Sequence, residues 1–275
     1  MYKSQFYCLE ITVPYKVIIL LTYCLFTASS LSYCAPFKIA TFHFPPYEYK
    51  SDDVITGISV DIVKAIFQEM GVEFELFELP WSRGLKALKT GKIDCFIEVL
   101  WKQERETYMD YAKEVLMPET ASFFVLGNSS IQFSGNLSTL SSYKIGVRQD
   151  FSYGSSFDSS IASNQYKIIT RRTKNEDLLR MLNTGEIDIL IGDKYGMLYL
   201  YQHTFIRHKR TIKRLTPDVE DTPSYMVFTK QRDLSAIRNQ FIKVLHNFKT
   251  DGRYQNIINH WEKALKQELT INPKP

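Results

Sequence analysis

A stretch of thirteen residues occurs nearly twice in this chain. The segment LKALKTGKIDCFI at 85–97 matches LRMLNTGEIDILI at 179–191. Each copy places leucines three residues apart on one face of a predicted helix, followed by a glycine, Gly91 or Gly185, that can adopt positive φ and end the helix. A short apolar run with the length of a buried strand comes next. The repeat predicts two similar α/β units, with chance similarity of two ordinary helix–strand turns as the alternative.

Two α/β units imply a place for a ligand and a way for the chain to connect them. In open α/β sheets, small ligands bind beyond the carboxyl ends of the strands, so two lobes offer a cleft with a wall from each. The β-prone runs at 122–126 and 225–228 predict two crossings between the lobes, which together form a hinge. We therefore expect an α/β fold of two lobes joined by two crossing hinge strands. The predicted division is lobe 1 at 37–124 and 225–265, lobe 2 at 125–224, and a C-terminal tail at 266–275.

Residues 1–33 have the layout of a secretory signal peptide. An apolar core from Ile18 to Phe26 follows Lys16 and precedes small residues. This core is too short to span a bilayer comfortably, so an uncleaved anchor is the weaker alternative. Cleavage after Ser30 and cleavage after Cys34 both fit the pattern. We expect an exported, periplasmic protein.

Composition narrows the functions open to an exported chain. Cys8 and Cys24 lie in the signal, so at most Cys34 and Cys95 remain and no disulfide framework is possible. Loss of two lysines and one glutamate with the signal lowers the formal net charge from +4 to +3, which is weak evidence for an anionic ligand. The densest basic run, at 207–214, contains no interleaved stacking aromatics. We interpret it as a solvated face rather than a nucleic-acid site.

Seven motifs in a fixed order carry a resemblance to a known family. They are FPPYEY at 44–49, GISVDIV at 57–63, LKTGKIDCFI at 88–97, ER at 104–105, YKIGVR at 143–148, TGEIDILIGD at 184–193 and DGRYQNIINHW at 251–261. Over roughly residues 37–263 the chain resembles bacterial extracellular solute-binding proteins of family 3, the polar amino-acid-binding partners of ABC importers. The resemblance implies a periplasmic binding protein-like fold, in agreement with the lobes predicted from the repeat.

The resemblance also implies roles for four residues. Arg105 matches the arginine that binds the ligand's α-carboxylate, a group that a guanidinium holds with two parallel N–H donors. Asp193 matches the carboxylate that receives the α-ammonium group. Ser152 matches a hydroxyl near a helix start, and Tyr47 matches the aromatic that covers the ligand's side chain. The structural alternatives are a surface arginine, a helix cap and simple lobe packing for Arg105, Asp193 and Tyr47.

This sequence also departs from the family pattern. Many amino-acid binders have a hydroxyl-rich stretch before the arginine, whereas residues 98–103 contain no hydroxyl here. Glu98, Trp101, Trp81 and Arg148 therefore join the predicted cleft, which is bulkier and more charged than a standard amino-acid site. An α-amino acid or a related small carboxylate is the first expectation for the ligand.

The sequence gives little support for metal binding, phosphate binding or catalysis. The five histidines show no metal-ligand spacing, and no phosphate loop or nucleophile elbow is present, so we expect no metal and no cofactor. Asp61, Asp94 and Asp188 stand at element boundaries, where caps are common, and are interpreted as structural. Glu98 is the only candidate general acid, since apolar neighbours could raise its pKa.

The favoured hypothesis is a non-enzymatic, monomeric binding protein that captures a small polar solute and delivers it to an ABC permease in the inner membrane. Two alternatives share the fold. One is a solute sensor for a separate signalling partner, and the other is an exported dehydratase-like enzyme that uses Glu98.

Overall fold

The described part of the chain alternates short strands with helices. The computed structural model describes residues 35–149, 151–205 and 210–270. Its strands are β1 (Phe37–Thr41), β2 (Tyr49–Ser51), β3 (Val54–Thr56), β4 (Phe74–Glu78), β5 (Cys95–Leu100), β6 (Met109–Tyr111), β7 (Met117–Leu126), β8 (Lys144–Arg148), β9 (Ile168–Arg172), β10 (Ile189–Asp193), β11 (Ile212–Arg214) and β12 (Glu220–Thr229). Its α-helices are α2 (Ile58–Met70), α3 (Trp81–Lys89), α4 (Ser155–Ala162), α5 (Asn175–Thr184), α6 (Lys194–Phe205), α7 (Ser235–Thr250) and α8 (Arg253–Thr270), with short 3₁₀ turns at Gln103–Thr107 and Leu137–Leu140.

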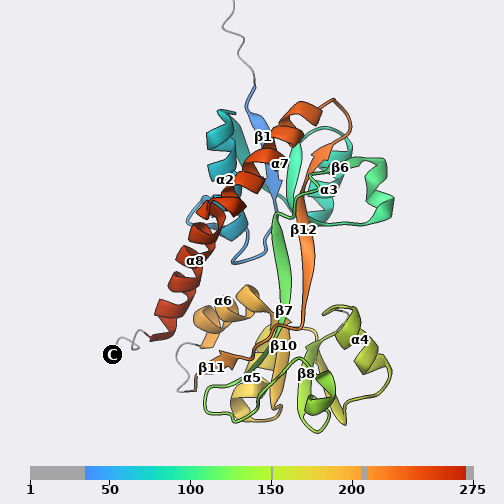
Figure 1. Cartoon of the computed structure of the whole chain (residues 1–275), viewed down its shortest axis with the longest axis vertical. Coiled ribbons are helices and arrows are strands. Elements are labelled where there is room, and N and C mark those ends of the chain that lie inside the picture. Colours follow the sequence, from blue (N-terminus) through green and yellow to red (C-terminus); the bar gives the residue numbers. More distant parts are fainter. Residues whose placement is uncertain (1–34, 150, 206–209, 271–275) are drawn as a thin grey trace, which may run out of the picture. The chain divides into compact units, whose positions relative to one another are not determined.

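One mixed sheet joins two α/β lobes. Its order is β4-β1-β5-β12-β7-β10-β8-β9, with β6 beside β12 and β11 beside β7. In the first lobe β1 is parallel to β4 and β5, and in the second β8 is parallel to β9 and β10. The long strands β7 and β12 run antiparallel to each other and pass from one group of elements to the other (Figure 1). The expected fold class of two lobes joined by two crossing strands is confirmed, and the exact lobe bounds given above stay predictions.

The duplicated segments form the same unit in both lobes. The first copy is α3 followed by β5, and the second is α5 followed by β10. Gly91 has φ +68° and Gly185 has φ +80°, the left-handed conformation that glycine adopts without steric cost and that ends a helix. The helix–glycine–strand reading of the repeat is therefore confirmed.

The aspartates of the two copies also make equivalent bonds. A carboxylate oxygen of Asp94 accepts a hydrogen bond from the Lys38 amide at 2.8 Å, and one of Asp188 accepts from the Lys144 amide at 2.9 Å. Lys38 lies in β1 and Lys144 begins β8, so each aspartate holds the neighbouring parallel strand near its start. The role is structural, as interpreted from sequence, but the aspartates secure strands rather than cap helices.

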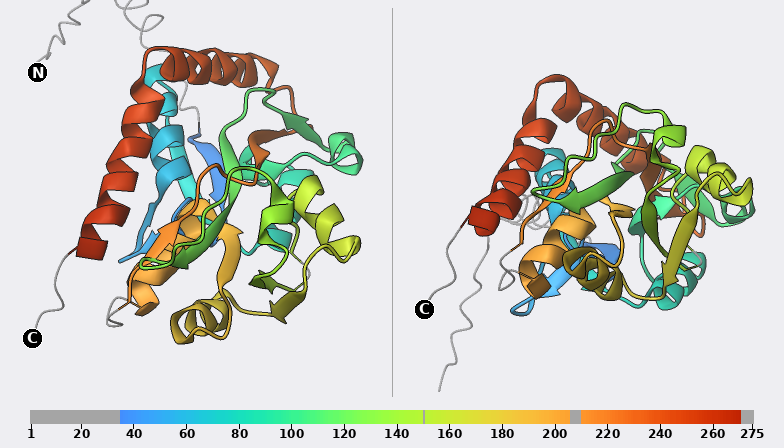
Figure 2. Two further views of the ribbon diagram at one scale, coloured as in Figure 1. Left: turned by 60° about the horizontal axis from the view of Figure 1, so that its bottom comes forward. Right: turned by 90° about the horizontal axis from the view of Figure 1, so that it is seen from below.

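Helices α2, α7 and α8 cover the first lobe. Their apolar faces contribute Ile62, Phe241 and Ile258 to a buried core, and α8 lies beside α2 after a sharp turn from α7 (Figure 2). Helix α8 continues to Thr270, five residues into the segment predicted as a tail. Within the described ranges, no helix is long and apolar enough to cross a membrane. The predicted signal peptide at 1–33 lies outside the described residues.

Candidate functional site

The two lobes meet at a hydrogen bond between Tyr47 and Asp193. Tyr47 follows β1 in the first lobe and is fully buried, while Asp193 ends β10 in the second. The Tyr47 hydroxyl donates toward both carboxylate oxygens of Asp193, with O–O distances of 3.0 and 2.8 Å. The Gly196 amide also donates to Asp193 at 2.7 Å, the contact expected of an N-cap at the start of α6. Asp193 thus has the cap role given as its structural alternative, and it also receives a bond from the other lobe.

Close packing against Gly57 also fixes the position of the Tyr47 backbone. Gly57 has φ +134°, and a Cβ there would lie 2.2 Å from the Tyr47 carbonyl oxygen. Only glycine allows this close approach of two chain segments. The sequence therefore fixes Tyr47 beneath the first turn of α2.

Buried carboxyl groups surround the Tyr47–Asp193 contact. Glu98 lies in β5, is 2% exposed, and accepts a hydrogen bond from the Ser59 hydroxyl through one oxygen. Its other oxygen is buried without a hydrogen-bond partner, as are both carboxyl oxygens of the fully buried Glu48. Glu98 also has φ +54°, a strained conformation for a residue with a side chain, and such strain is concentrated at functional sites.

Burial is the main cause that raises the pKa values of these acids, and neighbouring carboxylates add to it at Glu48, Glu98 and Glu119. Burial raises the pKa of Glu98 and of Glu48 well above the usual 4.5, and the proximity of further carboxylates adds to both shifts. Burial and the nearby Asp193 raise the pKa of Glu119 in β7 to about 7. Burial raises the pKa of Asp193 to about 6, although its hydrogen bonds act in the opposite direction. Near neutral pH this cluster therefore holds protons that exposed carboxyl groups would have lost.

A cavity of about 310 Å³ opens beside Asp193, at the carboxyl ends of the strands of the second lobe. Most of its wall comes from that lobe, including Arg148 and Asp193, and Phe44 and Pro45 of the first lobe complete it. The Arg148 guanidinium lies 5.6 Å from the Phe151 ring centre, over its face. The location agrees with the rule for open α/β sheets and with the cleft predicted from the repeat.

The remaining predicted residues lie apart from this cavity wall. Arg105 donates to the Leu100 carbonyl at 3.0 Å, and its guanidinium lies 5.3 Å from the centre of the Trp81 ring. Trp101 is 53% exposed and donates to Glu106. The structure therefore brings Arg105 and Trp81 together but places neither in the cavity wall that contains Asp193.

Ser152 is exposed, and its hydroxyl donates to Asp158 rather than to a group of the cavity wall. The neighbouring Tyr153 lines the cavity instead, and its hydroxyl accepts a hydrogen bond from the Arg148 amide at 2.7 Å. The loop after β8 thus presents an aromatic ring where the resemblance implied a serine hydroxyl.

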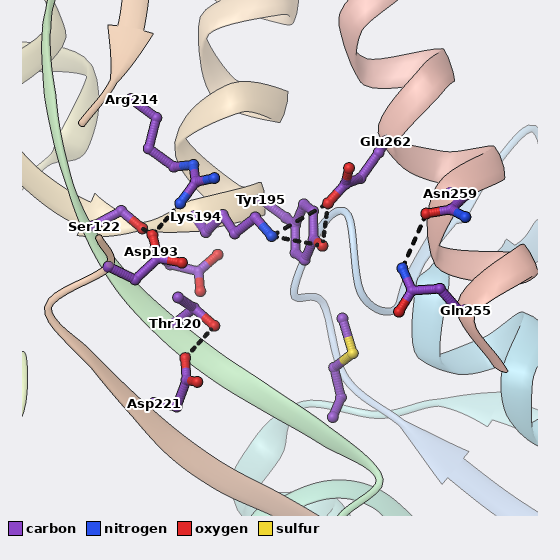
Figure 3. A network of polar contacts seen from close by, with 12 residues as sticks. Thr120, Ser122, Asp193, Lys194, Tyr195, Arg214, Asp221, Gln255, Asn259 and Glu262 are labelled. Carbon is purple, nitrogen blue, oxygen red and sulfur yellow. Dashed lines mark hydrogen bonds and ion pairs between the residues drawn. The ribbon is translucent and has the colours of Figure 1, made fainter. Parts of the chain in front are cut away.

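A second polar contact between the lobes lies next to Asp193 (Figure 3). Lys194 and Tyr195 begin α6, and both contact Glu262 of α8, at 3.2 and 2.7 Å. The Tyr195 ring also packs edge-on against Tyr47, with 5.9 Å between ring centres. The C-terminal helix therefore supports the same junction from the side of the first lobe.

Sequence reasoning missed three members of the buried cluster, namely Glu48, Ser59 and Glu119. Glu48 directly follows Tyr47 in the motif FPPYEY, and Ser59 lies inside the motif GISVDIV. These two family motifs could therefore have indicated both residues. Glu119 had no such signal, because it lies in the irregular stretch before the predicted strand. Its proximity to Asp193 arises only when β7 pairs with β10, where Ala121 is opposite Asp193.

Comparisons with known proteins agree with this architecture. Residues 38–264 match the family model described as bacterial extracellular solute-binding proteins, family 3. A "Probable histidine-binding protein" of Campylobacter jejuni is 25% identical over 232 residues, which cover 80% of this chain and 82% of the relative. The second substrate-binding domain of a putative amino acid ABC transporter from Streptococcus pneumoniae superposes with a TM-score of 0.69 at 19% identity, covering 82% of this chain and 99% of that one. The second substrate-binding domain of GlnP from Lactococcus lactis, in its open conformation, gives 0.70 at 18% identity, with coverage of 84% and 97%. The chain belongs to the bacterial extracellular solute-binding proteins of family 3.

Proposed function

We propose that this protein is exported, captures a small amino-acid-like ligand in the cavity between its lobes, and delivers the ligand to an ABC permease. The observation that carries the proposal is a cavity, walled by both lobes, that contains a carboxylate and a guanidinium, those of Asp193 and Arg148. Its volume of about 310 Å³ is at the small end of the range for ligand sites. The relatives named above are binding proteins, so we propose a binding role rather than a catalytic one.

Within this site we propose that Asp193 receives the ligand's ammonium group. Asp193 already accepts hydrogen bonds from both lobes, so its carboxylate is held rigidly and partly shielded from water. Arg148 lines the same cavity and is the nearer candidate for a ligand carboxylate than Arg105, whose guanidinium contacts Leu100 and Trp81. A guanidinium suits this task because its parallel donors match a carboxylate.

Calorimetry and thermal unfolding against the twenty amino acids test the proposal. A ligand that binds only the folded protein raises the melting temperature by mass action. We expect Arg148→Ala to weaken binding of the best amino acid by about 10- to 100-fold, the effect of losing a charged hydrogen bond. Arg105→Ala is the matched comparison and should have the smaller effect. Loss of binding in Arg105→Ala alone would restore the assignment implied by the family resemblance, and the absence of any ligand response would contradict the binding role itself.

A further inference from the structure

The cluster of acidic residues beside the cavity contains more carboxyl groups than hydrogen-bond donors or cations to pair with them. Four carboxyl groups and one phenol come together from four segments of both lobes, namely Tyr47, Glu48, Glu98, Glu119 and Asp193. Two of the carboxyl groups are almost fully buried, and three of their four oxygens make no hydrogen bond of ordinary length, although the Phe42 backbone is near enough to Glu48 to lower its pKa somewhat. Buried polar groups are nearly always paired, so each of these oxygens requires an explanation.

Within the described part of the chain, neighbouring cations do not supply the missing partners. Lys194 and Arg214 are drawn beside Asp193 in Figure 3, but they are paired with Glu262 and Asp218. The groups that face Glu98 are acids, hydroxyls and phenols: Tyr47, Ser59, Glu119 and Asp193, with Tyr254 of α8 on the far side. Glu48 faces Glu98, Glu119 and Glu78.

The cluster is continuous with the cavity through Asp193. Asp193 lies in the cavity wall and is opposite Ala121 in the sheet. Glu119 is two residues before Ala121 in β7 and therefore projects to the same face of the sheet. A ligand whose ammonium group binds Asp193 would therefore lie beside Glu119. The buried Glu98 is the next carboxyl group of the cluster.

We propose that this part of the site recognises a second positive charge, so that the ligand is a small organic cation with net positive charge. The inference rests on the proposed function, because it assigns a ligand class to the same site. A cation placed between Asp193, Glu119 and Glu98 provides the partners that the buried oxygens lack. It also offsets the cost of gathering carboxyl groups away from water.

The proposal predicts that ligand binding releases protons. Carboxyl groups with raised pKa values are partly protonated near neutral pH, and an approaching cation favours their ionised form. Binding therefore releases protons, and affinity for a cation increases as pH rises from about 5.5 to 8. Asp193, whose pKa is about 6, contributes to this signal with any ammonium ligand, so a second-cation site requires that lysine release more protons than glutamine.

Matched ligand pairs test the inference. Cadaverine differs from lysine, and agmatine from arginine, by the α-carboxylate, whereas glutamine has a carboxylate and no second cation. We expect lysine, arginine or their decarboxylated analogues to bind with proton release, measured by calorimetry in buffers of different ionisation enthalpy. Lysine binding without cadaverine binding would still support the second-cation site and would add a role for Arg148.

Variants localise the effect to the cluster. We expect Glu119→Gln and Glu98→Gln each to weaken cation binding by about 10- to 100-fold, as for loss of a charged hydrogen bond, and to reduce the number of protons released. Glu75→Gln on the exposed face of β4 is the matched control and should change neither quantity.

Three outcomes would overturn the inference, and only one of them also removes the proposed function. Glutamine binding as tightly as lysine, unaffected by Glu98→Gln, would leave an amino-acid binder without a cation subsite. Calcium chloride stabilising the protein, while glutamine binds and lysine, arginine, cadaverine and agmatine give no response, would assign the carboxyl groups to a metal ion and leave the amino-acid site intact. No response to any amino acid or amine would contradict both proposals.

Discussion

Replacing Glu119 by glutamine changes one buried carboxyl group into a neutral group of nearly the same shape. Burial and the neighbouring Asp193 raise the pKa of Glu119 from 4.5 to about 7. Because the pKa is higher in the folded protein, its contribution to stability is fully present below the unfolded value and is lost as pH rises through the folded value. Wild-type stability should therefore fall between about pH 4.5 and 7, and this shift corresponds to at most about 3 kcal/mol at 1.36 kcal/mol per pKa unit.

Glutamine cannot ionise, so the variant should escape this loss. We expect Glu119→Gln to match the wild type within about 1 kcal/mol at pH 4.5 and to be more stable by up to about 3 kcal/mol at pH 8. For a chain of this size that difference corresponds to an increase of about 6 to 12 °C in melting temperature. Urea and thermal unfolding across this pH range, with Glu75→Gln as the exposed control, measure it. A stability difference between variant and wild type that is constant with pH would refute the reasoning, because it would show that Glu119 does not change its pKa on folding.

Two further predictions concern the residues that hold the fold around the site. Gly57→Ala should destabilise the protein by several kcal/mol, roughly 3 or more, because its Cβ would collide with the Tyr47 backbone. Gly71→Ala, where φ is also positive but no atom lies within 4 Å, should cost only about 1–2 kcal/mol; equal losses of melting temperature in the two variants would contradict the packing argument. Asp188→Ala should cost about 1 kcal/mol, because the exposed start of β8 loses the acceptor for its Lys144 amide. Hydrogen exchange should then show faster exchange at Lys144, and unchanged protection there would contradict the assigned role.

Local sequence patterns predicted the repeating units well because their signals lie within a few residues. Leucine spacing predicted α3 and α5, and Gly91 and Gly185 marked where those helices end. Aspartate followed by an apolar run marked the entry into β5 and β10 in both copies. The pairing of each aspartate with a neighbouring strand was not visible, because it joins residues 56 and 44 positions apart.

The candidate site was only partly predictable. The family resemblance predicts that Tyr47 and Asp193 belong to the site, and the structure joins them by a hydrogen bond across the lobes. The same resemblance predicts Arg105, but its guanidinium contacts Leu100 and Trp81 outside the cavity wall. A motif gives the place of a residue along the chain, whereas the direction of a long, flexible side chain depends on neighbours from other segments.

Sequence alone determined that this chain forms two related α/β lobes, since helix and strand periodicity are local properties of the backbone. Only the tertiary structure decided which charges meet between them. The pairing of β7 with β10 brings Glu119 toward Asp193, and the burial of β5 removes Glu98 from water. Charge interactions depend on distance through space and on exclusion of water, and neither quantity is encoded in the spacing of residues along the chain.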